Sequence, residues 1–342
     1  MAEQSTSNVA VIIMPNGTSS SPLVTRSRFW FDDGNIVLQA ESTQFKLHRS
    51  VLASQSPVFK DIFSIPQPPD SNEATVDGCP VVHLQDSEED IENLCGLLYD
   101  TLRIHTFKKK MELSHIGTML RLGRKYRFKH FRSEALHLLE HEFPSDLAES
   151  DANAANYQYI ASTTGILFEV AYLAHENCIK SILPGVYILM CLNHTPQEMK
   201  EGFDLYREKY GRFLRAEEPL SCLLGREHIH RAVSQKTLAW LYDGRVPCSK
   251  CLNVPACNLA RTNHVLDVMK RSIQSAIRFS ADTWLQNKLS AGLCSSCALV
   301  AKDAYNTARE EVWHSLPEYF GLNSHVWDGD DVDDDEEKED MD

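Results

Sequence analysis

Two pairs of cysteines in the C-terminal half of the chain have the spacing of metal ligands. Cys248 and Cys251 are separated by two residues, and so are Cys294 and Cys297. A turn of this length brings two thiolates within reach of one ion, and two such turns supply the four sulfurs of a tetrahedral zinc site. Because four sulfurs leave no position open for water, the sequence predicts a structural zinc rather than a catalytic one.

The residues around the two pairs favour loops at both places. Gly244, Pro247 and Pro255 flank the first pair, and Gly292 precedes the second. The 42 residues between the pairs exceed the gap of common zinc modules. We expect this gap to contain a helix from roughly residue 263 to residue 279.

Other interpretations of the cysteines remain open. Cys257 is an alternative fourth ligand, and His264 is a weaker one. The pairs can also be unrelated buried thiols, since free cysteine is among the most buried residue types. A redox pair of the thioredoxin kind needs a βαβ context, which the pattern lacks. Zinc is preferred because both pairs fall within one window of 50 residues.

The length and composition indicate the setting of these cysteines. At 342 residues the chain is long enough for about two domains. No run of 18 uncharged apolar residues is present, so we expect no membrane span. The first residues lack the basic region of a secretory signal. Ten cysteines in such a chain favour the cytoplasm or nucleus over secretion.

The net charge of −14 is concentrated at the C-terminus. Residues 328–342 hold 11 acidic residues and one lysine, which is −10, so the remaining chain carries −4. Like charges at this density repel, and we expect a disordered acidic tail over 327–342. This tail either keeps the protein soluble or docks on a basic partner. Residues 1–24 are expected to be disordered as well.

The N-terminal third contains a hairpin followed by helices. Residues 35–40 and 44–48 alternate between apolar and polar side chains, which predicts two paired strands. Ser56 followed by Pro57 predicts a helix start. The apolar stripe behind it is built to be buried, and no catalytic group is presented. The stretch therefore indicates an interaction module.

This order of residues resembles the BTB/POZ family over 28–143. The matching positions are Asp33-Gly34, His48, Leu52-Ala53, Ser56-Pro57, Phe59 and Phe63. A strand at 81–84 follows, with helices expected at about 86–99, 113–127 and 129–141. We interpret the matching side chains as fold residues that cap and pack. Residues 64–80 contain four prolines, so we expect a loop that no helix or central strand crosses.

The resemblance implies a homodimer. In the family, the strand before the hairpin and the first helix exchange across a two-fold interface. Here that place holds three aromatic residues that we expect to be exposed in a single chain, and an apolar patch of this kind marks an interface. The predicted dimer interface consists of Arg28, Phe29, Trp30 and Phe31.

Two more specific roles are alternatives. Family members that act as cullin-type ubiquitin ligase substrate adaptors carry a hydrophobic-x-Glu motif after the helix ending near Phe63. Residues 64–67 lack that glutamate, which argues against this role. A transcriptional regulator could contact DNA through the cysteine region, but residues 248–297 hold few basic groups and no recognisable finger. We therefore expect a protein partner rather than nucleic acid.

The fold class predicted for the whole chain is α+β. A BTB/POZ domain at 25–143, a small sheet flanked by helices, precedes a mainly α-helical region at 145–326. Sharp helix starts are expected at Ser145-Asp146 and at Thr195, and a helix is expected over 226–242. No nucleophile elbow or phosphate-binding loop is present, so we expect no enzyme.

The end of the helical region carries a second resemblance. It is similar to the closing motif of fungal, mushroom-type BTB proteins, which join a BTB domain to a helical, cysteine-containing region. The matching residues are Arg309, Trp313, Leu316, Pro317, Phe320, Gly321 and Leu322. This resemblance implies no biochemical activity, and we expect a non-enzymatic adaptor or scaffold.

Overall fold

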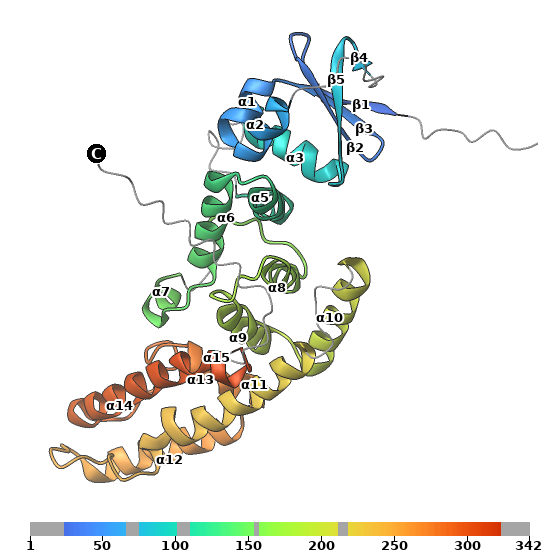
Figure 1. The fold of residues 1–342 in the computed structure, drawn as a ribbon. Helices are drawn as coiled ribbons and strands as arrows, with labels where there is room; N and C mark the ends of the chain where they lie inside the picture. The colour runs from blue at the N-terminus through green and yellow to red at the C-terminus, as the bar shows by residue number, and fades with distance from the viewer. Residues whose placement is uncertain (1–23, 66–74, 101–109, 154–156, 211–217, 323–342) are drawn as a thin grey trace, which may run out of the picture. The chain divides into compact units, whose positions relative to one another are not determined.

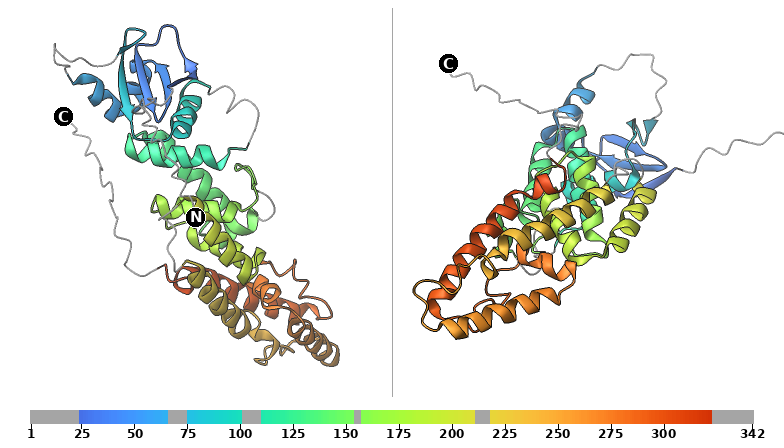
Figure 2. Two further views of the ribbon diagram at one scale, coloured as in Figure 1. Left: turned by 90° about the vertical axis from the view of Figure 1, so that its right-hand side faces the viewer. Right: turned by 90° about the horizontal axis from the view of Figure 1, so that it is seen from below.

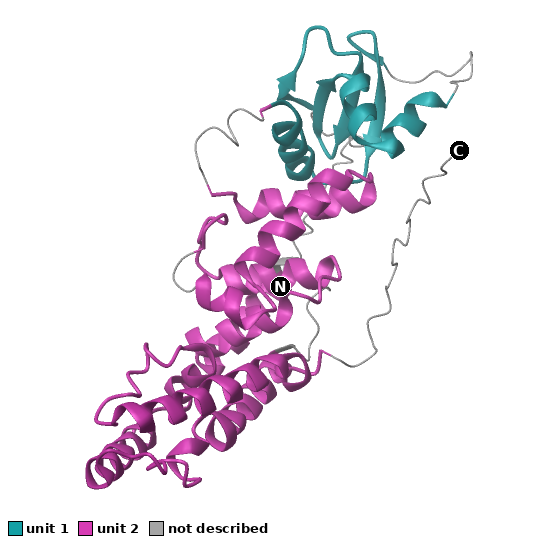
Figure 3. Ribbon diagram, turned by 90° about the vertical axis from the view of Figure 1, so that its left-hand side faces the viewer, with its two compact units in different colours: residues 1–99 teal, residues 100–342 magenta. Residues whose placement is uncertain are grey.

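A computed structural model describes residues 24–65, 75–100, 110–153, 157–210 and 218–322. They belong to two compact units, residues 1–99 and residues 100–342 (Figure 3). The predicted disordered tail at 327–342 lies outside the described residues, as does all but the last residue of the N-terminal segment 1–24. The family-like α+β order is present, with the strands first and a mostly helical region after them.

Unit 1 is built on a five-stranded sheet with the order β1-β3-β2-β5-β4. The predicted hairpin is formed by β2 and β3, with Ile36 opposite Leu47 and Ala40 opposite Thr43. β1 runs parallel to β3, β5 runs parallel to β2, and β4 is antiparallel to β5. The strands are β1 (Thr25–Trp30), β2 (Ile36–Ala40), β3 (Thr43–Leu47), β4 (Thr75–Val76) and β5 (Cys79–Leu84).

The expected loop over 64–80 is wrong for its last residues. Asp77 and Gly78 both have positive φ and form a turn between β4 and β5. Pro80 lies in β5 opposite Thr75 of the edge strand β4. A proline is tolerated near a sheet edge because a missing ladder N–H costs little there.

Three helices accompany the sheet within the described residues of unit 1 (Figure 1). The predicted start at Ser56 is confirmed, since its hydroxyl accepts a hydrogen bond of 3.1 Å from the Phe59 N–H. Phe59, like Phe45 of β3, is fully buried. The helices are α1 (Arg49–Gln55), α2 (Pro57–Ser64) and α3 (Glu88–Tyr99).

The Asp33-Gly34 pair and His48 have structural roles, as the sequence suggests. A Cβ on Gly34 would lie 3.0 Å from the carbonyl oxygens of both Phe31 and Leu47, so only glycine fits. His48 precedes α1 but makes no side-chain cap. Its Nε2 lies 3.1 Å from the Asp33 carboxylate and its Nδ1 3.4 Å from the Tyr99 hydroxyl. His48 therefore joins the hairpin to α3.

Unit 2 is mainly helical within its described residues. In sequence order, its α-helices run from α5 to α15 (Figures 1 and 2). A π-helical turn η1 (Val233–Thr237) and a short 3₁₀ turn η2 (Ala239–Leu241) follow α11. The α-helices are α5 (Leu113–Lys125), α6 (Lys129–Glu142), α7 (Leu147–Ala152), α8 (Ile166–Glu176), α9 (Leu183–Asn193), α10 (Pro196–Tyr210), α11 (Glu218–Ala232), α12 (Val254–Met269), α13 (Ile273–Ala281), α14 (Ser295–His314) and α15 (Leu316–Tyr319).

The core of unit 2 is centred on α9. Nine of its eleven residues are buried, so it has no solvent-facing stripe and behaves as an interior helix. Pro184 stands in its first turn, where a proline does not break the helix. α8, α11, α13 and α15 all pack against α9.

The predicted helix starts in unit 2 are confirmed. Thr195 and Glu198 form a reciprocal capping box, in which the Thr195 N–H donates to the Glu198 carboxylate at 2.7 Å and the Glu198 N–H donates to the Thr195 hydroxyl at 3.3 Å. The Asp146 carboxylate accepts from the N–H groups of Ala148 and Glu149 at the start of α7.

Two predicted helix boundaries are wrong. The helix expected over 226–242 ends as an α-helix at Ala232 and continues as η1 and η2. The helix expected over 263–279 is two helices, because Ser272 caps a new one by accepting from the Ser275 N–H. The first of these helices, α12, begins earlier than predicted, with the Asn253 side chain as its cap and Pro255 in its first turn.

Candidate metal centre

Five cysteines of unit 2 gather where one loop and two helix starts meet. Cys248 and Cys251 lie in the loop between η2 and α12. Cys257 lies in the first turn of α12, while Cys294 is the N-cap of α14 and Cys297 lies in its first turn. The two cysteine pairs, 42 residues apart in sequence, are therefore brought together as predicted.

Two contacts fix the segments that carry these cysteines. Gly292 has a φ of 78°, and a Cβ there would lie 2.9 Å from the Ala260 Cβ of α12. Only glycine therefore lets the chain turn into α14 this close to α12. The Arg261 guanidinium donates to the Val246 carbonyl at 3.1 Å, which ties α12 to the loop before it.

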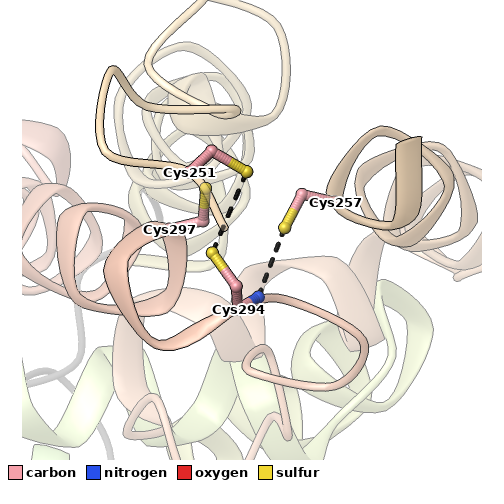
Figure 4. A group of neighbouring side chains, drawn as sticks. All are labelled: Cys251, Cys257, Cys294 and Cys297. Atoms are coloured by element: carbon pink, nitrogen blue, oxygen red, sulfur yellow. Dashed lines mark hydrogen bonds between the residues drawn. The ribbon is translucent and has the colours of Figure 1, made fainter. Parts of the chain in front are cut away.

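Four of the sulfurs form a mutual cluster. The Sγ atoms of Cys251, Cys257, Cys294 and Cys297 all lie within 4.8 Å of one another (Figure 4). Cys251 and Cys294 are separated by 3.9 Å between sulfurs. In a tetrahedral site with Zn–S bonds of about 2.3 Å, the sulfurs are about 3.8 Å apart. The donor set and its spacing therefore fit a tetrathiolate zinc.

Backbone N–H groups also point at these sulfurs. The Cys294 N–H donates to the Cys257 sulfur at 3.2 Å, and the Leu252 N–H donates to the Cys294 sulfur at 3.5 Å. The Cys248 N–H donates to the Cys297 sulfur at 3.4 Å. Such hydrogen bonds stabilise thiolates and orient metal ligands.

The electrostatic environment differs between the thiols. The backbone N–H of Leu252, followed by that of Cys297, lowers the pKa of the Cys294 thiol to about 6. Desolvation raises the pKa of the Cys251 and Cys297 thiols. Cys294 is thus the sulfur best prepared to accept a metal as a thiolate.

The structure favours the alternative ligand Cys257 as the fourth member of the cluster. The Cys248 sulfur lies 3.7 Å from that of Cys297 but is not a member of the mutual group. The predicted helix boundary at 263 placed Cys257 in a loop, but the Asn253 cap starts α12 early and orients this thiol. The role of Cys257 was predictable from a helix-start signal just before it, which consists of Asn253, Val254 and Pro255.

The other residues considered as ligands lie elsewhere. His264 Nε2 is 3.1 Å from the Ala291 carbonyl, and its ring packs against Trp240. Neither of these contacts directs it to the sulfurs. Cys95, Cys191 and Cys222 are fully buried singly, and none of the ten cysteines is in a disulfide.

The predicted interface residues lie on β1 and just after it. Phe29 is only 5% exposed, so the expectation that all three aromatics are exposed is wrong for this residue. Its neighbour Trp30 is partly exposed, with the Arg26 guanidinium 4.2 Å above its ring. Phe31 packs against Tyr99 with ring centroids 4.6 Å apart. Arg28 is exposed and pairs with Glu92 at 2.6 Å.

Comparison with known proteins identifies a domain in the N-terminal part of the chain. Residues 31–142 match the family model of the BTB/POZ domain. No curated protein matches the chain. The strand order and the helices of these residues agree with the match, and the chain thus carries a BTB/POZ domain, a protein-interaction module. The domain of this family is typically non-enzymatic.

The BTB/POZ match at 31–142 includes two segments, 66–74 and 101–109, that lie outside the described residues. It begins at Phe31, so β1 stands immediately before it. Residues 64–67 occupy the place of the glutamate motif associated above with cullin binding. Ser64 and Ile65 are described, whereas Pro66 and Gln67 lie outside the described residues.

Among the helices that the structure describes, none has the length and apolar character to cross a bilayer.

Proposed function

We propose that this protein is a non-enzymatic adaptor or scaffold that dimerises through its BTB/POZ domain and carries a structural zinc in unit 2. The match of residues 31–142 to the BTB/POZ domain is the observation that carries this proposal. The ten free cysteines agree with the reducing cytoplasm or nucleus as its compartment.

The position of β1 supports self-association. β1 is at one end of the strand order, so its outer edge has no neighbouring strand within the described residues. An edge strand of this kind can pair with a strand of another chain. Trp30 adds a partly exposed aromatic side chain at this edge, and aromatic residues are enriched at interfaces. A two-fold pairing of two chains would cover both features.

Light scattering of the full chain tests dimerisation. We expect a dimer at micromolar concentration, and we expect Trp30→Asp to weaken association because it places a charge in an apolar interface. His83→Asp, an exposed position on β5, is the matched control and should leave the dimer intact. Phe29→Asp is unsuitable because Phe29 is buried within its own chain. A monomeric wild-type protein would refute the proposal.

The zinc proposal assigns Cys251, Cys257, Cys294 and Cys297 as ligands. Elemental analysis of protein purified without chelator should find about one zinc per chain. Cys257→Ser should lose the metal, because three sulfurs cannot complete the tetrahedron. Cys95→Ser, which removes a buried thiol outside the cluster, should keep it. If the wild-type protein contained no bound metal, the zinc part of the proposal would be refuted.

The transcriptional alternative makes a different prediction. Residues 248–297 contain six Lys and Arg and two Asp, so this segment is positive within an acidic chain. If it bound DNA, affinity would fall steeply with salt because phosphate contacts release counterions. We expect no such binding. Salt-dependent binding that Lys250→Glu weakens would favour the regulator instead.

A further inference from the structure

The cysteine cluster contains one thiol more than a zinc ion can use. Four sulfurs lie within 4.8 Å of one another, and the sulfur of Cys248 stands outside this group. Even so, it is only 3.7 Å from the sulfur of Cys297. A tetrahedral zinc takes four ligands, so Cys248 remains a free thiol in contact with a metal ligand.

The two sulfurs differ sharply in their access to solvent. Cys248 is partly exposed in the loop before α12, whereas Cys297 is fully buried in the first turn of α14. A small oxidant therefore meets Cys248 first. Cys297 is held next to it by the hydrogen bond from the Cys248 N–H, so the second thiol of a pair is already in place.

The distance between the sulfurs can close without a change of fold. The two sulfurs are 3.7 Å apart. A disulfide bond is about 2.05 Å long, so they must approach each other by less than about 2 Å. Cys248 lies outside any helix, and a rotation of its side chain can supply this movement.

We propose that Cys248 and Cys297 form a peroxide-sensitive oxidation site that releases the metal. The inference rests on the zinc centre proposed above. The Cys248 sulfur attacks one oxygen of hydrogen peroxide, an S–O bond forms, the O–O bond breaks, and the departing hydroxide takes the thiol proton to become water. The sulfur of Cys248 is then a sulfenic acid.

The second step uses the buried ligand. The Cys297 thiolate leaves the metal and attacks the Cys248 sulfur, so the S–S bond forms and the S–O bond breaks. The hydroxide that leaves takes a proton from solvent and becomes a second water. Two sulfurs have together lost two electrons, and one peroxide has been reduced to two waters. Cys251, Cys257 and Cys294 remain, and three sulfurs do not complete the site.

Peroxide treatment of the zinc-loaded full chain tests the site with two separate readouts. A colorimetric chelator follows zinc release, and peptide mass spectrometry without reduction locates the disulfide. Trypsin cleaves after Lys250 and so separates Cys248 from Cys251 and Cys257. We expect peptide 246–250 to be linked to peptide 289–302, with fragmentation placing the bond at Cys297 rather than Cys294.

Three variants complete the design. Cys248→Ser should keep its zinc in the absence of peroxide. When peroxide is added, this variant should form no linked peptide and should release its zinc more slowly than the wild type. Cys178→Ser, which removes another partly exposed thiol away from the cluster, should behave as wild type. Cys257→Ser, which lacks zinc, should still form the linked peptide.

The outcomes separate the oxidation site from the zinc centre. Loss of zinc from untreated Cys248→Ser would overturn the inference, because Cys248 would then be a ligand. A peroxide-induced bond between another pair, such as Cys251 and Cys294, would also overturn it. A wild-type protein without metal that still links 246–250 to 289–302 would support the oxidation site and refute only the zinc.

Discussion

At the scale of single residues, the cysteine cluster is set by where two helices begin. Cys294 is the N-cap of α14, and its sulfur accepts the Leu252 N–H. Cys257 is in the first turn of α12. Helix starts offer N–H groups without helical partners, and these groups favour thiolate over thiol. The local structure thus prepares the Cys294 sulfur as a thiolate before any ion arrives.

Metal retention should depend on pH because the ligands bind as thiolates, of which that of Cys294 forms most easily. Its pKa is lowered to about 6, below the ordinary thiol value of about 8.5. Because the pKa of Cys294 is lowered in the folded site, its thiolate stabilises that site at pH values above the ordinary thiol pKa. This stabilisation is lost as the pH falls through about 6. We expect zinc content after dialysis to fall as the solution is acidified, because protons compete with the ion for all four thiolates. Zinc content that stays unchanged as the solution is acidified would contradict thiolate ligation.

At the scale of elements, the resemblance at the C-terminus has a physical explanation. Arg309 of α14 is buried, and its guanidinium donates to both oxygens of Asp151 in α7. The Trp313 indole N–H donates to the Ser145 carbonyl at 2.8 Å. Phe320 packs on Tyr187 and fills the space that a side chain at Gly225 would occupy. These residues fasten α14 and α15 onto earlier helices.

Removal of the Asp151 carboxylate should destabilise unit 2. Asp151→Ala leaves a buried guanidinium without its anion, and such a loss costs about 3–5 kcal/mol in a fully buried pair. The Asp151 side chain is 30% exposed, so we expect about 2–3 kcal/mol. Urea unfolding would measure it. Glu149→Ala removes an exposed carboxylate of the same helix and should change stability by less than about 0.5 kcal/mol.

The elements differ in how far their sequence determines them. The hairpin, Ser56-Pro57 and the Thr195 capping box were predictable because the signal and its effect lie within a few residues. The division between α12 and α13 was missed because Ser272 stands inside a continuous helical pattern. The burial of Phe29 was missed because it depends on residues distant in sequence. The choice between Cys248 and Cys257 likewise depends on how the first turn of α12 meets the start of α14, where the Cys294 N–H donates to the Cys257 sulfur.

At the scale of the whole molecule, the two units should respond separately to loss of the metal. Each has its own core, and all five clustered cysteines belong to unit 2. We expect Cys294→Ser to speed hydrogen exchange over residues 245–322 and to leave unit 1 unchanged, because the cluster ties the loop before α12 to α14. Equal protection in variant and wild type would show that the cysteines contribute nothing to this packing.

The acidic residues 328–342 lie outside the described residues, and they remain a prediction from composition. We expect a chain that ends at residue 327 to keep its thermal midpoint, because a segment of this charge has little apolar surface to bury. Differential scanning calorimetry of both chains is the measurement. A loss of several degrees would show that the segment docks on the rest of the protein.

The bond between Asp151 and Arg309 has a consequence for synthesis. The two residues are 158 positions apart, so α7 leaves the ribosome well before its partner exists. At about 5–20 residues per second, the delay is about 10–30 s. During that time the carboxylate of Asp151 and the carbonyl of Ser145 face water. Unit 2 can close only when α14 has emerged, so a nascent chain depends on its last helices to finish folding.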